Sequence, residues 1–322
     1  MAANQGSDLD SVERRLVWMM GSPRTGSTWL LRLLLHPWGV GRTPTGIDPS
    51  RFRPRGGNVI PVNESYLAHH IGPMRDPLPP PEAAADTSVV LNDLRRSDPA
   101  YFFSDEYADD WRGPLRELAL KRFQAQSLRA EAAHGLREPQ IVIKEPNGSH
   151  AADLIAELFP SSRMIFLLRD GRDVIDSMMD ADSAGGWRTR TEGVQPLVTA
   201  EQRLQGVRRQ AQLWLVRISA TERACRRLGP EQSIRVRYED LLTDTESELA
   251  RIDAWLGLRR DARQIRAAVS TNRFKSLRNR LRGRRKGVRA ASPGLWRENL
   301  TEAEQQAMNE LIGPKLAELG YE

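Results

Sequence analysis

The feature that most constrains the fold is a glycine-containing loop that directly follows a short apolar run. Residues 16–20 read Leu-Val-Trp-Met-Met, and residues 21–28 read Gly-Ser-Pro-Arg-Thr-Gly-Ser-Thr. A mostly apolar stretch over 28–36 follows and is ended by Pro37. A buried strand, a glycine loop and a helix in this order are typical of a phosphate-binding loop, where amides at the helix N-terminus hold an anion. We therefore predict such a loop at 21–28.

The loop differs from the Walker A pattern at one position. Ser27 stands where that pattern has a lysine, and Arg24 is the only cation in the loop. A kinase uses the lysine together with magnesium because the transferring phosphoryl group carries several negative charges. The loop therefore predicts a phosphate-containing ligand but weighs against a Walker-type kinase.

Further along the chain, apolar runs alternate with helical patterns. Strands are predicted at 141–144, 163–168 and 233–238, and the longest helix at 201–228. Such alternation is typical of a parallel sheet covered on both faces. We predict an α/β fold, a P-loop-like three-layer domain with a central parallel sheet flanked by helices.

One domain accounts for most of the chain. We expect residues 1–15 to be a polar tail and residues 16–322 to form a single domain with mobile insertions. The insertions are expected at about 37–63, 77–100, 181–198 and 270–295, where Gly, Pro and polar residues are frequent.

Charge and cysteine content narrow the function classes. The net charge is +6, and arginines are concentrated between Arg259 and Arg289, which favours an anionic ligand. Cys225 is the only cysteine, so neither an internal disulfide nor a thiolate metal cluster is possible. The N-terminal residues lack the apolar core of a signal peptide, and no apolar run is long enough to span a bilayer. We expect a cytoplasmic protein without a membrane partner.

Cations follow three of the predicted strands. They are Arg24 in the glycine loop, Lys144 after 141–144, and Arg169 after 163–168. In parallel sheets, ligands bind beyond the carboxyl ends of the strands. The structural alternatives are that Lys144 is a solvated strand end and that Arg169 pairs with Asp173. Three cations at the carboxyl ends of predicted strands together favour an anion-binding site.

Four segments resemble the sulfotransferases that use 3′-phosphoadenosine 5′-phosphosulfate (PAPS). The segment Gly-Ser-Pro-Arg-Thr-Gly-Ser-Thr-Trp-Leu at 21–30 is similar to the family's 5′-phosphosulfate loop, and residues 166–179 are similar to its 3′-phosphate segment. Residues 236–242 and 284–301 resemble two further family segments. The four keep the family's order and span residues 16–301. The resemblance implies transfer of a sulfuryl group from PAPS to the hydroxyl of a small-molecule acceptor, with adenosine 3′,5′-bisphosphate (PAP) as product.

The resemblance also assigns donor-binding roles. Arg169 and Ser177 would hold the 3′-phosphate, while Trp29 and Tyr238 would lie at the adenine. The loop residues that would hold the 5′-phosphosulfate are Pro23, Arg24, Thr25, Gly26, Ser27 and Thr28. The residues that would close over the 3′-phosphate are Arg285, Lys286 and Gly287, and Phe274 is a looser match to a residue stacked on the purine.

Two cations would serve the chemistry in this family. Arg24 would stabilise the leaving phosphate electrostatically, because an arginine does not readily give up its proton. Lys144 would lie near the transferring sulfuryl group. That group carries less charge than a phosphoryl group, so no metal ion is expected.

The general base is the point at which this chain departs from the animal cytosolic members. They carry Lys-x-His after the second strand, whereas this chain has Lys144-Glu145-Pro146. The candidates are Glu64, Glu145, His69 and His70. Because a glutamate is the base in related carbohydrate, tyrosyl-protein and bacterial enzymes, we predict Glu64, with His70 orienting the acceptor. The structural alternative is that Glu64 caps the loop or forms a salt bridge there.

Two other functions are weighed against this one. The first is a small-molecule kinase, disfavoured by the missing lysine. The second is a nucleic-acid-binding protein that uses the basic segment 273–289. That segment contains one aromatic residue and no recognisable RNA or DNA module, so nucleic acid is not an expected partner.

Overall fold

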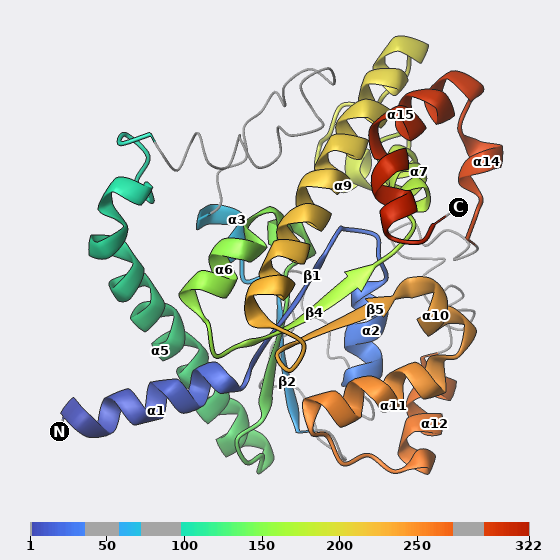
Figure 1. Ribbon diagram of the computed structural model, residues 1–322. Helices are drawn as coiled ribbons and strands as arrows, with labels where there is room; N and C mark the ends of the chain where they lie inside the picture. The colour runs from blue at the N-terminus through green and yellow to red at the C-terminus, as the bar shows by residue number, and fades with distance from the viewer. Residues whose placement is uncertain (1, 36–57, 72–97, 273–292, 322) are drawn as a thin grey trace.

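The computed structural model describes residues 2–35, 58–71, 98–272 and 293–321. At its centre is a five-stranded sheet with the order β2-β3-β1-β4-β5, in which every neighbouring pair is parallel (Figure 1). The strands are β1 (Leu16–Gly21), β2 (Val59–Asn63), β3 (Gln140–Lys144), β4 (Arg163–Leu168) and β5 (Ser233–Arg237). The predicted α/β fold with a central parallel sheet is confirmed.

Helices connect the strands and cover both faces of the sheet. The first half of the described chain contains α1 (Ala2–Arg14), α2 (Ser27–Leu34), α3 (Leu67–Ile71), η3 (Asp105–Tyr107), α5 (Ala108–His134), η4 (Pro146–Ala151) and α6 (Ala152–Leu158). The second half contains α7 (Gly171–Ala181), α8 (Trp187–Thr191), α9 (Ala200–Leu228), α10 (Tyr238–Thr243), α11 (Thr245–Leu256), α12 (Ala262–Thr271), α14 (Trp296–Asn299) and α15 (Glu302–Glu318). Among these described helices, none is long and apolar enough to cross a membrane.

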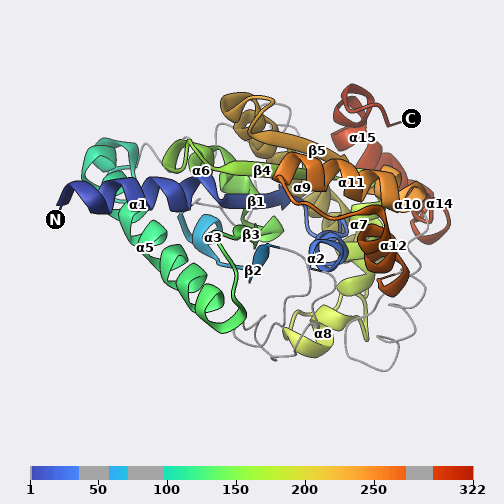
Figure 2. The same ribbon diagram turned by 90° about the horizontal axis from the view of Figure 1, so that it is seen from below.

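The central strand β1 divides the core into two layers. Its residues are buried on both sides, as expected for a strand inside a parallel sheet. Trp18 belongs to the layer formed with α5 and α6, where its ring packs against Phe123 and Phe159. Val17 and Met19 belong to the opposite layer, formed with α2, α11 and α12. Side chains alternate in this way because successive residues of a strand face opposite sides. Figure 2 shows the sheet between the two sets of helices.

The order of the strands reverses at β1. The chain passes from β1 to β2 and β3 on one side, and only then to β4 and β5 on the other. Such a switch point opens a crevice at the carboxyl ends of the strands, where ligands of open α/β sheets bind. The loop after β1 therefore lies between the residues that follow β3 and those that follow β4.

The structure differs from the sequence prediction at the N-terminus. Residues 2–14, expected to be a polar tail, form α1, which packs along α5 (Figure 1). Leu9 and Val12, three residues apart and therefore on one face of the helix, contact the core. Glu13 is fully buried, where it accepts a hydrogen bond from the Ser161 amide (2.7 Å) and pairs with Arg116. Two apolar residues in a polar segment were too few to reveal this helix.

The predicted insertions also contain regular structure. The last five residues of the expected loop 37–63 form β2, an edge strand of the described sheet. Pro61 is tolerated there because an edge strand leaves one side of its backbone unpaired. The segment 181–198 contains α8, and α12 continues to Thr271 inside the expected 270–295 insertion. Residues 36–57, 72–97 and 273–292 lie outside the described part of the chain.

Candidate active site

Two glycines give the loop after β1 its shape. Gly21 approaches β4 so closely that a Cβ would lie 2.1 Å from the Leu167 carbonyl oxygen. Gly26 has a φ of 85° and caps α2 without a side chain, and a Cβ there would meet the Tyr238 ring at 2.7 Å. Thr25 donates from its hydroxyl to the Ser22 carbonyl (2.7 Å) and so closes the loop. The loop thereby leads directly into the N-terminus of α2, a backbone arrangement at which proteins commonly bind anions.

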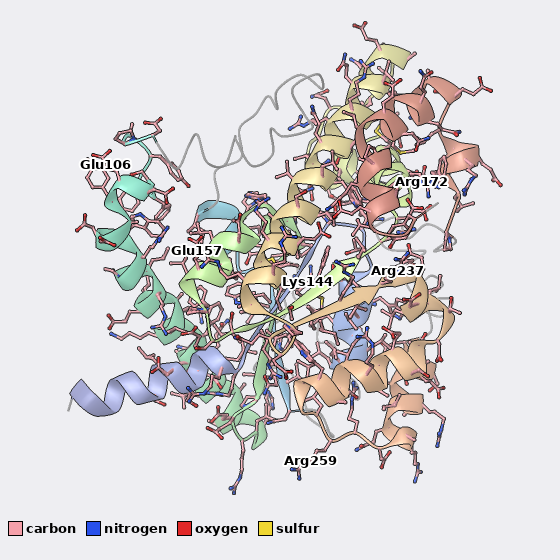
Figure 3. The ribbon with its side chains drawn as sticks, viewed as in Figure 1. Glu106, Lys144, Glu157, Arg172, Arg237 and Arg259 are labelled. Carbon is pink, nitrogen blue, oxygen red and sulfur yellow. The ribbon has the colours of Figure 1, made fainter. Side chains whose placement is uncertain are left out.

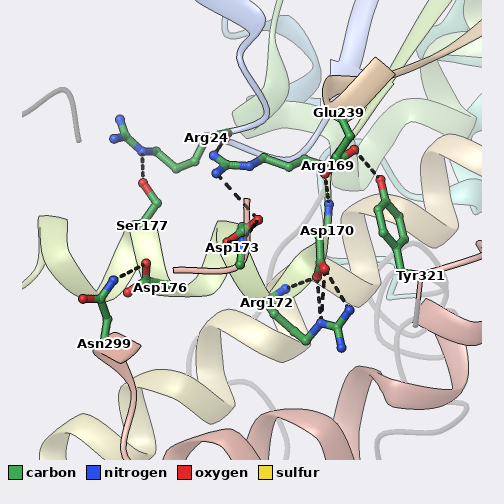
Figure 4. A network of polar contacts seen from close by, with 11 residues as sticks. Arg24, Arg169, Asp170, Arg172, Asp173, Asp176, Ser177, Glu239, Asn299 and Tyr321 are labelled. Atoms are coloured by element: carbon green, nitrogen blue, oxygen red, sulfur yellow. Dashed lines mark hydrogen bonds and ion pairs between the residues drawn. The ribbon is translucent and has the colours of Figure 1, made fainter. Parts of the chain in front are cut away.

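Arg24 joins the loop to the segment that follows β4. Its Nε donates to the Ser177 hydroxyl (2.8 Å), and its carbonyl oxygen accepts a hydrogen bond from Arg169 Nη1 (2.9 Å), as Figure 4 shows. Its φ of 70° is uncommon for a residue other than glycine and often marks a functional loop. Three residues predicted from two separate motifs are therefore in direct contact.

Arg169 retains hydrogen-bonding capacity inside the site. Its Nε is buried and has no hydrogen-bond partner among the described residues. The pairing with Asp173, the structural alternative for this arginine, is long at 3.9 Å, and the guanidinium stacks over the Tyr238 ring at 4.5 Å. A buried N–H donor without a partner is costly unless a ligand accepts from it. The geometry therefore fits a phosphate at Arg169.

A second set of contacts holds the turn between β4 and α7, which carries Arg169. Asp170 accepts from the Arg172 amide (2.9 Å) and pairs with the Arg172 guanidinium (2.8 Å), while its own amide donates to Glu239 (2.9 Å). The Tyr321 hydroxyl donates to the other Glu239 oxygen (3.0 Å; Figure 4). Sequence reasoning singled out the segment 236–242 but not Glu239, and it missed Tyr321. Only the fold brings Tyr321 to this turn.

The two aromatic residues predicted for the adenine site are adjacent. Trp29 and Tyr238 pack edge to face with ring centroids 6.1 Å apart. The Trp29 indole is 5% exposed, belongs to the core on the α2 side, and donates from Nε1 to the Asn272 carbonyl oxygen (2.9 Å). The structure thus places Trp29 mainly in the core, beside the loop, and Tyr238 between Gly26 and Arg169.

The predicted base and the predicted lysine form an ion pair. Glu64 and Lys144 lie at the ends of the neighbouring strands β2 and β3, where the Glu64 amide donates to the Lys144 carbonyl oxygen (2.9 Å). Lys144 Nζ lies 2.6 Å from Glu64 Oε1, and Asn147 Nδ2 lies 3.4 Å from Oε2. The lysine is at the centre of the molecule, unlike the peripheral Glu106 and Arg259 (Figure 3). Glu64 therefore makes the salt bridge of the structural alternative, and its partner is itself a predicted site residue.

The other candidate bases have different surroundings. Glu145 is fully buried, with the Ser65 hydroxyl on one carboxylate oxygen and the His69 amide on the other (3.0 Å). Burial raises the pKa of Glu145, but both of its oxygens face donors from the protein, so the carboxylate is poorly placed to accept a substrate proton. His69 is exposed and packs its ring against His150 (centroids 5.9 Å apart). The side chain of His70, at the end of α3, lies outside the described part.

The other residues predicted for the donor site differ in exposure, and some lie outside the described ranges. Ser27 is buried at the start of α2 and Thr28 is exposed, while Pro23 is half-buried. Arg285, Lys286, Gly287 and Phe274 lie outside the described residues. Within the described ranges, no group of three or more His, Cys, Asp or Glu residues is arranged to hold a metal ion.

Asp173 makes the stability of the nucleotide-free protein depend on pH. Burial raises the pKa of this carboxyl to about 6, although Arg169 acts in the opposite direction. The unfolded chain loses this proton near its ordinary pKa of about 3.9. Between these values the folded state binds the proton more tightly, so the contribution to stability falls as pH rises from about 4 to 6.

We expect Asp173→Asn to remove this dependence. The amide oxygen can still accept from the Gly294 amide, which lies 3.0 Å from Oδ1 in the parent. The melting temperature of the variant, relative to the parent, should therefore rise as pH increases from about 4 to 7. Thermal unfolding of both proteins across this range is the measurement. A constant difference would show that the carboxyl does not titrate in the folded protein within that range.

Comparison with known proteins shows the family of this chain. The model of the sulfotransferase family matches residues 17–262, which include the loop after β1, Lys144, Arg169 and Tyr238. Protein-tyrosine sulfotransferase A of Caenorhabditis elegans is 25% identical over 125 residues, which are 39% of this chain and 29% of that protein. The protein-tyrosine sulfotransferase of Drosophila melanogaster is 26% identical over 121 residues, which are 38% of this chain and 21% of that protein. The chain thus matches less than a third of the length of either relative.

Solved structures share the fold. A mouse sulfotransferase crystallised with PAP superposes with a TM-score of 0.53 at 11% identity, covering 94% of this chain and 84% of that one. These matches do not favour the kinase or the nucleic-acid-binding alternative. Because the family model covers most of the chain, this chain belongs to the sulfotransferase family.

Proposed function

We propose that this protein transfers a sulfuryl group from PAPS to the hydroxyl of a small-molecule acceptor and releases PAP, without a resident metal ion. The observation that carries the proposal is the convergence of Arg24, Ser177 and Arg169 at the start of α2, joined by hydrogen bonds of 2.8 and 2.9 Å. This cluster offers a guanidinium, a hydroxyl and helix amides on a single crevice, which suits a ligand with two separate phosphate groups.

The two motifs would bind different phosphate groups of the donor. The amides and hydroxyls of residues 23–28 would hold the 5′-phosphosulfate. Arg24 would stabilise the charge that develops on the leaving phosphate. Arg169 would use its buried Nε, which has no hydrogen-bond partner among the described residues, on the 3′-phosphate together with Ser177. Arg24 Nε donates to the Ser177 hydroxyl in this structure. Nucleotide binding would replace this hydrogen bond by hydrogen bonds from both side chains to phosphate oxygens.

The acceptor side would be served by Glu64 and Lys144. PAPS supplies an activated sulfuryl group whose bond to the phosphate oxygen breaks as the acceptor oxygen bonds to sulfur. Glu64 would take the hydroxyl proton, and Lys144 would stabilise charge on the sulfuryl oxygens. Their contact of 2.6 Å supports this division, because it places a proton acceptor and a cation at the same strand ends beside the loop.

The proposal predicts strong selectivity for a nucleotide that carries a 3′-phosphate. PAP should raise the melting temperature far more than adenosine 5′-monophosphate, because each charge-assisted hydrogen bond to the extra phosphate contributes about 1.5–3 kcal/mol. Thermal unfolding at equal nucleotide concentrations is the measurement. Adenosine 3′-monophosphate is the control that separates the two phosphate sites. Equal shifts with PAP and adenosine 5′-monophosphate would contradict the assignment.

A further inference from the structure

The turn that carries Glu64 has an unusual backbone. Glu64 has a φ of 53° and Tyr66 a φ of 60°, so both neighbours of Ser65 are in the left-handed region. Non-glycine residues occupy this region rarely, and they remain there only where surrounding contacts impose it. The turn joins β2 to the short helix α3, so its conformation sets the direction of the Glu64 side chain.

Glu145 contacts this turn at two points. The Ser65 hydroxyl donates to Glu145 Oε2, and the His69 amide donates to Oε1 (3.0 Å). One carboxylate therefore holds the middle of the turn and the helix that follows it. The same Ser65 oxygen accepts from the Leu67 amide (3.3 Å), which links the two contacts.

The Glu145 side chain is enclosed by the protein. Glu145 is inaccessible to solvent, and the chain after it approaches α3 very closely. A Cβ at Gly148 would lie 2.7 Å from the His69 amide nitrogen and 2.9 Å from Glu145 Oε1. A carboxylate this deeply buried requires hydrogen-bond donors, and it finds them on the turn that carries Glu64.

We propose that Glu145 is a positioning residue that directs Glu64 through Ser65. Glu145 follows Lys144 directly, so one strand end supplies both the cation that pairs with Glu64 and the carboxylate that holds its turn. This explains why a glutamate stands beside the lysine although both of its carboxylate oxygens accept from the turn and from α3. The inference rests on the proposed function, because it takes Glu64 as the base.

The test uses Glu145→Gln and Ser65→Ala in the full-length protein, with two readouts. The first is hydrogen–deuterium exchange of the amides at 64–69. Exchange there should become faster in both variants while the amides of β1 stay unchanged. Unchanged exchange at 64–69 in both variants would overturn the inference, whether or not the protein uses PAPS. If Glu145→Gln does not fold, Ser65→Ala still decides, because its hydroxyl is only partly buried.

The second readout is single-turnover sulfuryl transfer in a double-mutant cycle. Ser65→Ala should lower the rate about 10- to 100-fold in the parent, with PAP affinity unchanged. In a Glu64→Gln background it should change the rate by less than about threefold, because the base is already absent. An equal loss in both backgrounds would overturn the positioning role. PAP binding by the parent reports separately on the proposed function.

Ser162→Ala is the matched control. Ser162 is also a serine, is fully buried, and donates its hydroxyl to the Phe159 carbonyl oxygen (2.7 Å) at the start of β4, the end of the sheet opposite the site. This variant loses a hydroxyl contact of the same kind but should leave exchange at 64–69 and the transfer rate unchanged. If it slowed transfer as much as Ser65→Ala, the effect would reflect general loosening of the fold and not Glu64.

Discussion

Glu64→Gln is expected to lower sulfuryl transfer by about 10²–10⁴-fold, the range typical of a lost general base. Glutamine preserves the shape of the side chain and can still accept a hydrogen bond from Lys144, but it cannot take the acceptor's proton. PAP affinity should change little, because Glu64 lies at the end of β2, whereas Arg24, Ser177 and Arg169 form a separate cluster. Single-turnover transfer together with PAP titration is the measurement.

The size of the loss should depend on the acceptor. An aliphatic alcohol requires the base fully, whereas a phenol, with a pKa of about 10, requires it less. Glu106→Gln is the control, because Glu106 is exposed at the periphery of the molecule. His70→Ala should be measured alongside. A near-normal rate for Glu64→Gln together with a large loss for His70→Ala would place the base on the histidine.

Arg169→Ala should weaken PAP binding by about 10- to 100-fold, while affinity for adenosine 5′-monophosphate changes little. The expectation follows from the buried Nε, whose charge-assisted hydrogen bond to the 3′-phosphate contributes about 1.5–3 kcal/mol. The PAP affinity of Arg169→Lys should lie between those of the parent and Arg169→Ala, because an ammonium keeps the charge but not the geometry of the guanidinium. Calorimetric titration with both nucleotides is the measurement.

The comparison of nucleotides distinguishes this role from a packing role. Arg169 also stacks on Tyr238 and donates to the Arg24 carbonyl oxygen, so its removal could loosen the loop. A loosened loop would weaken both nucleotides by the same factor. Ser177→Ala, which removes a hydroxyl from the same cluster, should also act on PAP alone. An equal loss for both nucleotides would therefore show that Arg169 supports the loop and does not contact the 3′-phosphate.

Sequence patterns predicted those parts of the fold that depend on local order. The apolar run before Gly21 and the glycines of the loop predicted a strand and a tight turn, because the residues that require this conformation are neighbours in the chain. The parallel sheet followed from strands that alternate with helices. The N-terminal helix was missed because its only signal is Leu9 and Val12, and β2 was missed because Pro61 interrupts its pattern.

Site residues within one continuous motif were predicted from the sequence, whereas contacts made only by the fold were not. Arg24, Ser177 and Arg169 belong to continuous motifs, and the fold brings them together as expected. The pairing of Glu64 with Lys144 depends on the register of β2 against β3, which no local pattern specifies. Glu239 accepts from the Asp170 amide and from the Tyr321 hydroxyl. Because 82 residues separate Glu239 from Tyr321, sequence spacing gave no indication of their contact.

The position of β1 in the middle of the sheet has a consequence for how the chain folds as it is synthesised. This strand pairs with residues 141–144 on one side and 163–167 on the other, so both partners are synthesised long after it. Both edges of this apolar strand stay open until residue 144 has emerged, and the edge that pairs with β4 stays open until residue 167 has emerged. Open edges of this kind promote aggregation. Contacts between such distant segments also slow folding, because long loops must close before the contacts form. Shortened versions that end before β4 should therefore be insoluble, and useful truncations are to be sought elsewhere.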